Sequence, residues 1–205
     1  MDRAIEEILR EFEKRAETES EKIRQWDPAK MGRHLDEFLL YVGPATGQLI
    51  NLLAKEAKAQ TLLEVGSSYG YSTVWLAEAA RETGGKVISI EIHSSKQQHA
   101  RAAIQNAGLD GFVDFRLGDA RDTLAGMSES VDFVLLDLWK DLYVPCFDLF
   151  YPKLRPGALI AADNMIFPES AGDHAEAYRK YVRSKPDINS VLLRVGHGIE
   201  LSRYR

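Results

Sequence analysis

Two apolar segments of the sequence end in side chains that carry oxygen. FVLLD ends in Asp137, and ALIAAD ends in Asp163, which Asn164 follows directly. These residues offer carboxylate and amide oxygens with no cysteine or histidine beside them, which favours a hard cation, Mg²⁺ or Mn²⁺, over Zn²⁺. Three protein ligands would leave about three octahedral positions for water or for neighbouring hydroxyls of a substrate. We therefore predict a metal site formed by Asp137, Asp163 and Asn164.

An amine follows the first of these carboxylates within one short loop, in the sequence DLWKDLY. A phenol loses its proton only near about pH 10, so a phenolic nucleophile needs a base at neutral pH. Lys140 is the base that this stretch offers, because a nearby cation would depress its pKa. In isolation Lys140 would be interpreted as a solvated lysine, and Asp163-Asn164 as a turn. Their joint occurrence beside a ligand pocket favours catalysis by Lys140.

That ligand pocket is indicated by the segment EVGSSYG, which begins at Glu64. Gly66 and Gly70 stand where dinucleotide-binding proteins carry a glycine-rich turn between a strand and a helix. Glu64 would repel a pyrophosphate and attract a cation, which favours a nucleoside with a sulfonium, S-adenosylmethionine. Glu91 ends the next strand, where an acid accepts hydrogen bonds from ribose hydroxyls, and Asp119 could meet the adenine amino group. The alternative is that the glycines only permit a turn and the acids only cap helices.

These residues need a scaffold that brings strand ends to one edge. Short β-branched or apolar runs alternate with helical ones, which is typical of βαβ units. The predicted strands are TLLEV, KVISIE, FVDFRL, VDFVLLD and ALIAAD, followed by an antiparallel pair, INSVLLRV and GIELSRYR. Predicted helices span Ser72 to Arg81, Ser94 or Ser95 to Ala107, Ala120 to Ala125, Tyr143 to Leu154, which Arg155-Pro156-Gly157 closes, and about Ala171 to Ser184. The fold class is a doubly wound, mostly parallel, Rossmann-like α/β sheet with helices on both faces and an antiparallel last strand.

Length and composition fit one domain. The chain has 205 residues, 45% apolar and 28% charged, with a formal net charge of −5. Acidic charge and scattered basic residues argue against nucleic acid as a partner, and no run is long enough for a membrane span. The single cysteine and the charged N-terminus favour a cytoplasmic location. We expect residues 61–205 to form the α/β core and residues 1–60 a helical N-terminal cap.

The N-terminal segment carries Ile5, Ile8, Leu9 and Phe12 at helical spacing. This stripe is interpreted either as a face packed on the chain's own domain or as a lid or homodimer contact. The five histidines show no ligand spacing and are interpreted as positions without a metal.

DLWKDLY and ADNMIFPE, with LLEVGSSYGYSTVWLA and VISIEIH, together resemble the metal- and S-adenosylmethionine-dependent O-methyltransferases. The catechol O-methyltransferase branch is the most similar in these motifs, and the caffeoyl-CoA O-methyltransferases are more distant. The resemblance implies the metal ligands and the lysine base already described, with a diphenol as acceptor. It also implies donor-site residues Val42, Gly66, Ser72, Ala120, Asp137 and Trp139, and acceptor-site residues Phe38, Lys140, Asn164 and Pro168.

Two positions depart from the catechol pattern. Leu138 stands where those enzymes usually carry histidine, and Val191 aligns roughly with a carboxylate that meets the second hydroxyl of the substrate. The sequence predicts methyl transfer to a catechol-like small molecule without specifying which hydroxyl is methylated. The alternatives are the same chemistry on a larger phenolic ester such as a CoA conjugate, or an S-adenosylmethionine-binding protein without catalysis.

Overall fold

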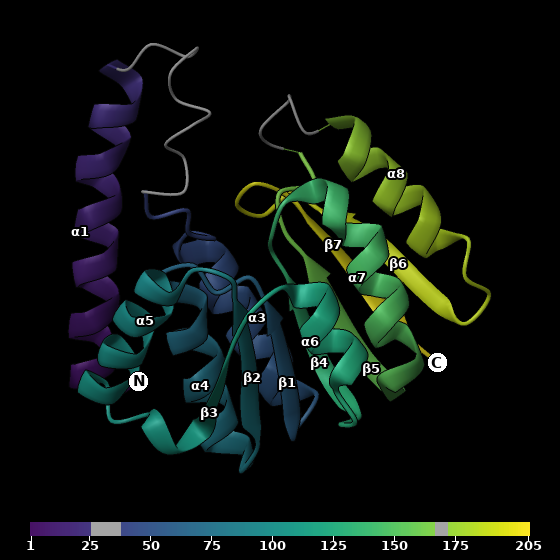
Figure 1. The fold of residues 1–205 in the computed structure, drawn as a ribbon, viewed down its shortest axis with the longest axis horizontal. Helices are drawn as coiled ribbons and strands as arrows, with labels where there is room; N and C mark the ends of the chain where they lie inside the picture. Colours follow the sequence, from purple (N-terminus) through teal and green to yellow (C-terminus); the bar gives the residue numbers. More distant parts are fainter. Residues whose placement is uncertain (26–37, 167–171) are drawn as a thin grey trace.

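The computed structural model describes residues 1–25, 38–166 and 172–205, and in this part of the chain seven strands form one sheet (Figure 1). The strand order is β3-β2-β1-β4-β5-β7-β6. Strands β1 to β5 pair in parallel, and β7 pairs antiparallel with both β5 and β6. The strands are β1 (Thr61–Val65), β2 (Lys86–Glu91), β3 (Val113–Leu117), β4 (Val131–Leu136), β5 (Leu154–Ala162), β6 (Ile188–Leu193) and β7 (Ile199–Tyr204). The predicted fold class, including the antiparallel last strand, is confirmed.

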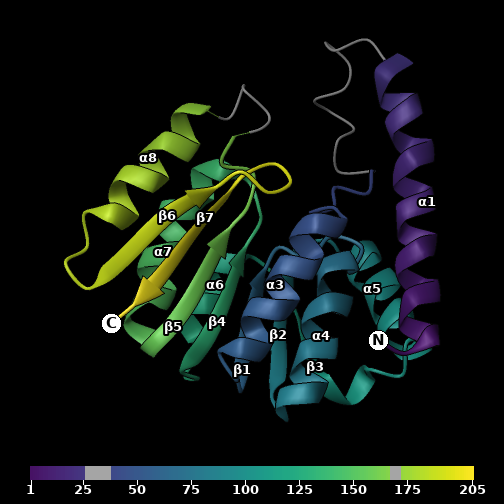
Figure 2. The ribbon, with the colours of Figure 1, turned by 180° about the vertical axis from the view of Figure 1, so that it is seen from behind.

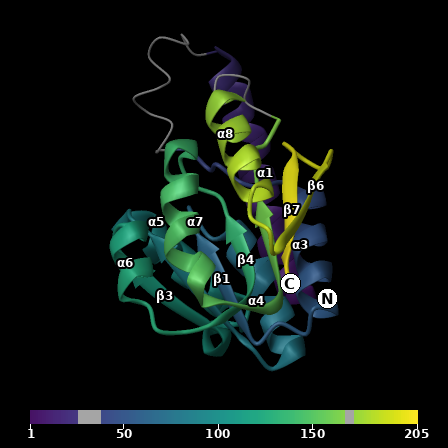
Figure 3. The ribbon, with the colours of Figure 1, turned by 90° about the vertical axis from the view of Figure 1, so that its right-hand side faces the viewer.

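Helices cover both faces of this sheet. On one face lie α3 (Pro44–Glu56), α4 (Tyr71–Thr83) and α5 (Ser94–Asn106), and α1 (Arg3–Gln25) packs outside α4 and α5. On the other face lie α6 (Ala120–Gly126), α7 (Tyr143–Phe150) and α8 (Gly172–Arg183). Figure 2 shows α3 and α4 in front of the sheet, and Figure 3 shows the sheet between α7 and α3. Short 3₁₀ turns are η2 (Asp110–Phe112), η3 (Lys140–Leu142) and η4 (Tyr151–Lys153).

Strand residues alternate between two hydrophobic cores, because successive side chains point to opposite faces of a sheet. Leu62, Phe133 and Leu135 pack with the first helix layer. Leu63 and Val134 pack with the second. Since both faces are covered, the central strands read as continuous apolar runs. For this reason residues 133–136 (FVLL) are all apolar, and the first polar side chain is that of Asp137, just after the strand ends.

The N-terminal stripe packs on its own domain. Ile5, Leu9 and Phe12 are buried in the same core as α4 and α5. Ile50 of α3 also belongs to that core, so the part of the predicted cap that forms α3 is one of the sheet-covering helices.

One predicted boundary was wrong. The helix expected to run to Leu154 ends at Phe150, and Leu154 already begins β5. Pro152 lies in the η4 turn between them, and a proline inside a helix removes a backbone donor and clashes with the preceding turn. The segment Arg155 to Gly157, expected to close that helix, lies inside β5, where the pairing with β4 shifts register.

Candidate active site

The predicted site residues follow the carboxyl ends of adjacent strands. Leu136 of β4 pairs with Ala162 of β5, so Asp137 and Asp163, each one position further, leave the sheet side by side. The backbone of Asp163 donates to the carbonyl of Leu136 over 3.1 Å. Helices α4 and α7, which follow the neighbouring strands β1 and β4, lie on opposite faces. The topological switch point, where open α/β sheets bind ligands, is therefore beside Asp137.

Gly66 brings the loop after β1 against the backbone of Asp137. A Cβ atom at Gly66 would lie 2.1 Å from the carbonyl oxygen of Asp137, and the Gly66 φ angle is +94°. A larger residue would clash and would also adopt this φ with strain. Gly66 therefore allows the donor loop (residues 66–70) to lie directly beside the predicted metal ligands.

Asp163 is buried without the partners that a buried carboxylate normally has. Its residue exposure is 1%, and within the described residues neither carboxylate oxygen has a hydrogen-bond partner. Burial and the nearby charge of Asp137 raise the pKa of Asp163 to about 8. An unpaired buried carboxylate is costly unless a cation binds it. The two orphaned oxygens therefore fit the predicted hard-cation site.

Only two carboxylates belong to this predicted site. In residues 1–25, 38–166 and 172–205 no group of three or more His, Cys, Asp or Glu side chains is arranged to hold a metal. The third predicted ligand is an amide, Asn164, whose backbone has a positive φ of 55°. Burial raises the pKa of Asp137 as well, although the charge of Lys140 opposes this shift.

Lys140 has three hydrogen-bond acceptors around its amine. The Nζ atom donates to the carbonyl of Leu138 over 3.1 Å, to the hydroxyl of Tyr143 over 2.7 Å and to Oδ1 of Asn164 over 3.0 Å. It also lies 3.8 Å from Oδ1 of Asp137. Burial lowers the pKa of Lys140, while the charges of Asp137 and Asp163 oppose the shift. The structure thus brings the predicted base into contact with two of the three predicted metal ligands.

The hydroxyl of Tyr143 continues this network. It donates to the backbone carbonyl of Asp163 over 3.1 Å and leaves a lone pair for Lys140. Tyr143 is fully buried, so the network is anchored in the core formed by α7. The sequence placed Tyr143 only at the start of a predicted helix, and this role was missed, although the short spacing from Lys140 could have indicated it.

His197 was interpreted from sequence only as a position without a metal, and the structure brings it to the site. Its Nδ1 lies 3.4 Å from Nδ2 of Asn164. The turn between β6 and β7 is tied to the loop after β5, because the backbone of Ile166 donates to the carbonyl of His197 and that of Met165 to Gly198, each over 2.9 Å. No local sequence signal indicates this contact, since β7 reaches the site by pairing with β5.

Glu64 is fully buried and accepts three hydroxyl hydrogen bonds. Ser72, Thr73 and Ser89 donate to it over 2.7, 2.7 and 2.6 Å. Burial raises the pKa of Glu64 to about 7, and the hydroxyls oppose this shift. Glu64 and Ser72 therefore bind each other, and the predicted attraction of Glu64 for a cationic ligand would act through its charge.

Glu91 ends β2 and holds the donor loop. Its carboxylate accepts from the backbone of Ser68 over 2.8 Å and from that of His93 over 2.9 Å. Each oxygen accepts one of these hydrogen bonds and keeps a second lone pair, which leaves capacity for two hydroxyl groups. This arrangement suits the predicted binding of ribose hydroxyls.

Asp119 caps α6, as the alternative interpretation expected. It accepts from the backbone of Arg121 over 2.8 Å and pairs with the Arg121 guanidinium, which lowers the pKa of Asp119 to about 2. Ala120 is the first residue of α6, and Trp139 is half exposed directly before η3. Contacts of Asp119 and Trp139 with adenine, and of Ala120 with the donor, stay predictions.

The remaining predicted residues precede α3. Phe38 and Val42 are buried in the segment that leads into this helix. Pro168, the other predicted apolar wall, lies outside the described residues.

Comparison with known proteins places this arrangement in a family. Residues 13–205 match the O-methyltransferase family. The chain belongs to that family. The match covers the strands, both helix layers and every described site residue.

Relatives in the O-methyltransferase family include two kinds of named enzyme. The chain is 36% identical over 129 residues to a catechol O-methyltransferase of Niastella koreensis, covering 61% of this chain and 58% of that protein. It is 32% identical over 178 residues to caffeoyl-CoA O-methyltransferase 2 of Populus trichocarpa, covering 77% and 72%. The chain thus spans less than two thirds of the length of the Niastella protein.

Solved structures agree with this fold. A cofactor-bound protein from MTB shares 26% identity and a TM-score of 0.76, covering 88% of this chain and 91% of its own. An O-methyltransferase from Bacillus cereus in complex with SAH shares 24% identity and a TM-score of 0.78, covering 100% and 92%. The second likeness shows the fold alone.

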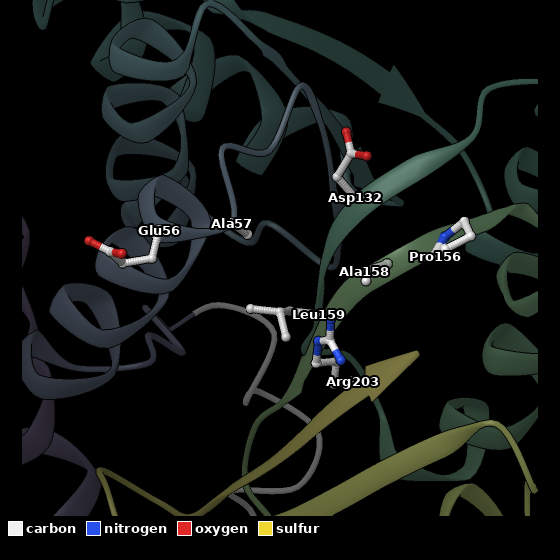
Figure 4. Close-up of a pocket in the computed structure, with 8 residues that line it drawn as sticks. Glu56, Ala57, Asp132, Pro156, Ala158, Leu159 and Arg203 are labelled. Atoms are coloured by element: carbon white, nitrogen blue, oxygen red, sulfur yellow. The ribbon is translucent and has the colours of Figure 1, made fainter. Parts of the chain in front are cut away.

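Two observations concern regions outside this O-methyltransferase site. A hollow of about 440 Å³ lies between the end of α3 and strands β4, β5 and β7 (Figure 4). Its lining includes Glu56, Asp132 and Arg203, and it is at the amino end of β4, opposite to the edge that carries Asp137.

None of the helices in the described ranges has the length and apolar character needed to cross a membrane.

Proposed function

We propose that this chain transfers the methyl group of S-adenosylmethionine to one hydroxyl of a catechol-like diphenol. The observation that carries the proposal is the position of Lys140, whose amine lies 3.8 Å from Asp137 and 3.0 Å from Asn164 at the switch point of an O-methyltransferase-family fold. A buried amine between two oxygen-bearing side chains has the geometry expected of a base beside a bound acceptor.

The donor would lie on the loop after β1. Glu91 fixes the backbone of Ser68 in this loop and retains lone pairs for the ribose hydroxyls. Glu64, when it is ionised, would favour a sulfonium and disfavour a phosphate at this loop. The similar MTB protein is cofactor-bound, which supports the proposal that this chain also binds a cofactor.

Asp137, Asp163 and Asn164 would hold a divalent cation, as the orphaned oxygens of Asp163 suggest. When bound, Mg²⁺ or Mn²⁺ would supply Lewis-acid stabilisation of the acceptor oxygens. Asp163 would bind the cation without giving up a side-chain hydrogen bond, because neither of its carboxylate oxygens has a partner among the described residues. Asn164 would exchange its hydrogen bond from Lys140 for the cation.

Lys140 would accept the hydroxyl proton of the acceptor on Nζ. Burial already lowers its pKa, and a neighbouring cation or sulfonium would disfavour the ammonium form further. The acceptor oxygen then forms a bond to the methyl carbon while the carbon–sulfur bond breaks and leaves a neutral thioether. Because opposite charges cancel in this step, the protein contributes mainly by positioning the two substrates and excluding water.

A specific alternative exists for the acceptor, namely a CoA ester in place of a free diphenol. The Populus relative is a caffeoyl-CoA O-methyltransferase, and it matches more of this chain than the Niastella catechol enzyme does. A CoA ester would need basic side chains for its phosphates, and the basic residues of this chain are scattered along the sequence. The carboxylate, amide and amine of the site suit a protein that catalyses, since a module that only bound the donor would not need them.

The test is a methylation screen with S-adenosylmethionine and Mg²⁺, scored by mass spectrometry. The acceptors are a set of vicinal diphenols, matched monophenols and caffeoyl-CoA. We expect a mass gain of one methyl group on vicinal diphenols and none on monophenols. Turnover of caffeoyl-CoA without turnover of free diphenols would select the CoA-ester alternative, and no product with any phenol would refute the proposal.

A further inference from the structure

Helix α1 is hydrogen-bonded to the segment before α3 through the carboxylate of Glu19. Its Oε2 accepts a hydrogen bond from the backbone of Leu39 over 2.5 Å, and its Oε1 accepts from Nε of Arg15 over 2.6 Å. The Glu19 side chain is only 14% exposed, so this pair is shielded from solvent. Leu39 follows Phe38, the predicted apolar wall of the acceptor site, and lies in the segment that contains Val42. Glu19 therefore fixes the backbone of the acceptor wall.

The same pair reaches the donor loop on its other side. The guanidinium of Arg15 lies 3.9 Å from the centre of the Tyr69 ring, and the amine of Lys96 lies 5.5 Å from it. Tyr69 stands between Gly66 and Gly70 in the loop that Glu91 holds. A guanidinium stacked on an aromatic ring is attracted by the ring quadrupole and fixes its orientation. Arg15 thus holds the donor loop while Glu19 holds Arg15.

A second carboxylate of α1 contacts the start of α4. Glu13 of α1 accepts a hydrogen bond from the hydroxyl of Tyr71 over 2.8 Å. Tyr71 begins α4 and packs edge-on against Tyr41, with ring centres 5.0 Å apart. Tyr41 precedes Val42. Helix α1 is therefore joined to the acceptor-wall segment (residues 38–43) at Leu39 and, through Tyr71, at Tyr41, and to the donor loop at Tyr69.

We propose that Glu19 is a positioning residue, which sets the acceptor wall against the donor loop through Leu39 on one side and through Arg15 and Tyr69 on the other. The proposal rests on the proposed function for its meaning in catalysis. Small displacements of a substrate wall cost much in rate when two substrates must be aligned. In this view α1 contributes to substrate binding although none of its described residues needs to touch either substrate.

Substitutions separate the contact of Glu19 with Leu39 from its contact, through Arg15, with Tyr69. Glu19→Ala removes both, and we expect a roughly 5- to 50-fold rise in the KM for the diphenol together with weaker donor binding. Glu19→Gln keeps an amide oxygen for Leu39 and loses the charge that pairs with Arg15. Arg15→Met removes only the connection to Tyr69. For both of these variants we expect a roughly 3- to 10-fold rise in the Kd for S-adenosylmethionine, with the KM for the diphenol within about twofold of wild type.

The matched control is Glu7→Ala. Glu7 accepts from Nε of Arg3 over 2.9 Å at the same four-residue spacing on the same helix, and both side chains are exposed. We expect this variant to leave the Kd for S-adenosylmethionine and the KM for the diphenol unchanged. Donor affinity is measured by calorimetry with S-adenosylmethionine alone, and the thermal midpoint of each variant is measured beside it.

Amide hydrogen exchange tests the contact between Glu19 and the acceptor-wall segment without any substrate. Glu19→Ala should raise amide exchange at residues 38–43, whereas Glu7→Ala should not, and this result is independent of whether the chain methylates a phenol. Failure of wild type to bind S-adenosylmethionine would refute the proposed function and leave the exchange result to decide the connection. Unchanged exchange at residues 38–43 in Glu19→Ala, or a donor Kd within twofold of wild type in Arg15→Met, would overturn the positioning role.

Discussion

The amine of Lys140 donates a hydrogen bond to the side-chain oxygen of Asn164 over 3.0 Å. The proposed function assigns the same oxygen to the cation, so a cation and the protonated lysine would compete for it. Loss of this acceptor would disfavour the ammonium form, which retains the carbonyl of Leu138 and the hydroxyl of Tyr143 as partners. Metal occupancy and the proton-accepting state of Lys140 are thereby coupled in the proposed mechanism.

Lys140→Met should lower kcat by roughly 10²- to 10⁴-fold, the range for one general base. Methionine keeps much of the stem's bulk, so the Kd for S-adenosylmethionine should stay within about twofold of wild type. Steady-state kinetics on a diphenol and calorimetry measure the two quantities. Raising the pH should partly rescue the variant, because the acceptor then loses its proton to solvent. The control is Lys86→Met, an exposed lysine at the amino end of β2, and wild-type turnover by Lys140→Met would remove the lysine from the mechanism.

Glu91→Ala should weaken S-adenosylmethionine binding by about 1.5–3 kcal/mol, the usual contribution of hydrogen bonds to a charged group. Part of this loss would come from releasing the backbone of Ser68, which Glu91 holds over 2.8 Å. Calorimetry on Glu91→Ala and on Glu56→Ala, which removes an exposed carboxylate at the opposite hollow, separates this site from a general effect of charge. Equal affinities for the two variants would contradict the ribose assignment.

Asp163→Asn should abolish Mg²⁺ binding and at the same time stabilise the metal-free protein. The carboxylate is buried and has no described hydrogen-bond partner, so replacing it with a neutral amide relieves an unpaired charge. We expect the thermal midpoint of the metal-free protein to rise by roughly 2–8 °C at pH 8 and above. Asp122→Asn changes an exposed aspartate and serves as the control. A lower midpoint for Asp163→Asn would show that the carboxylate has a structural partner.

Glu64→Gln should flatten the pH dependence of stability. The pKa of Glu64 is raised from 4.5 to about 7 in the folded protein, so between these values the folded state binds more protons than the unfolded state. Stability therefore falls as the pH rises from about 4.5 to about 7, by up to about 3 kcal/mol from this group. Thermal midpoints measured from pH 4.5 to 7.5 should show a smaller decline for Glu64→Gln than for wild type, and identical declines would contradict the raised pKa.

The fold and the position of Asp137 and Asp163 at one edge of the sheet followed from the sequence because both depend on local signals. Continuous apolar strands, and acids at their ends, place Asp137 and Asp163 at one edge once the sheet is parallel. The contacts that the sequence did not predict are long-range. His197 reaches Asn164 only because β7 pairs with β5, and Glu19 reaches Leu39 only because α1 packs outside α4 and α5. No spacing along the chain encodes either contact.

Methyl transfer in the presence and absence of chelator tests the central claim most directly. Product is measured with a vicinal diphenol, and S-adenosylmethionine binding is measured by calorimetry under the same conditions. We predict that excess chelator abolishes turnover, that Mg²⁺ or Mn²⁺ restores it, and that the Kd for S-adenosylmethionine changes by less than about threefold, because the donor and the cation use largely different residues. Full turnover in excess chelator would contradict the account and leave Lys140 to act without a cation.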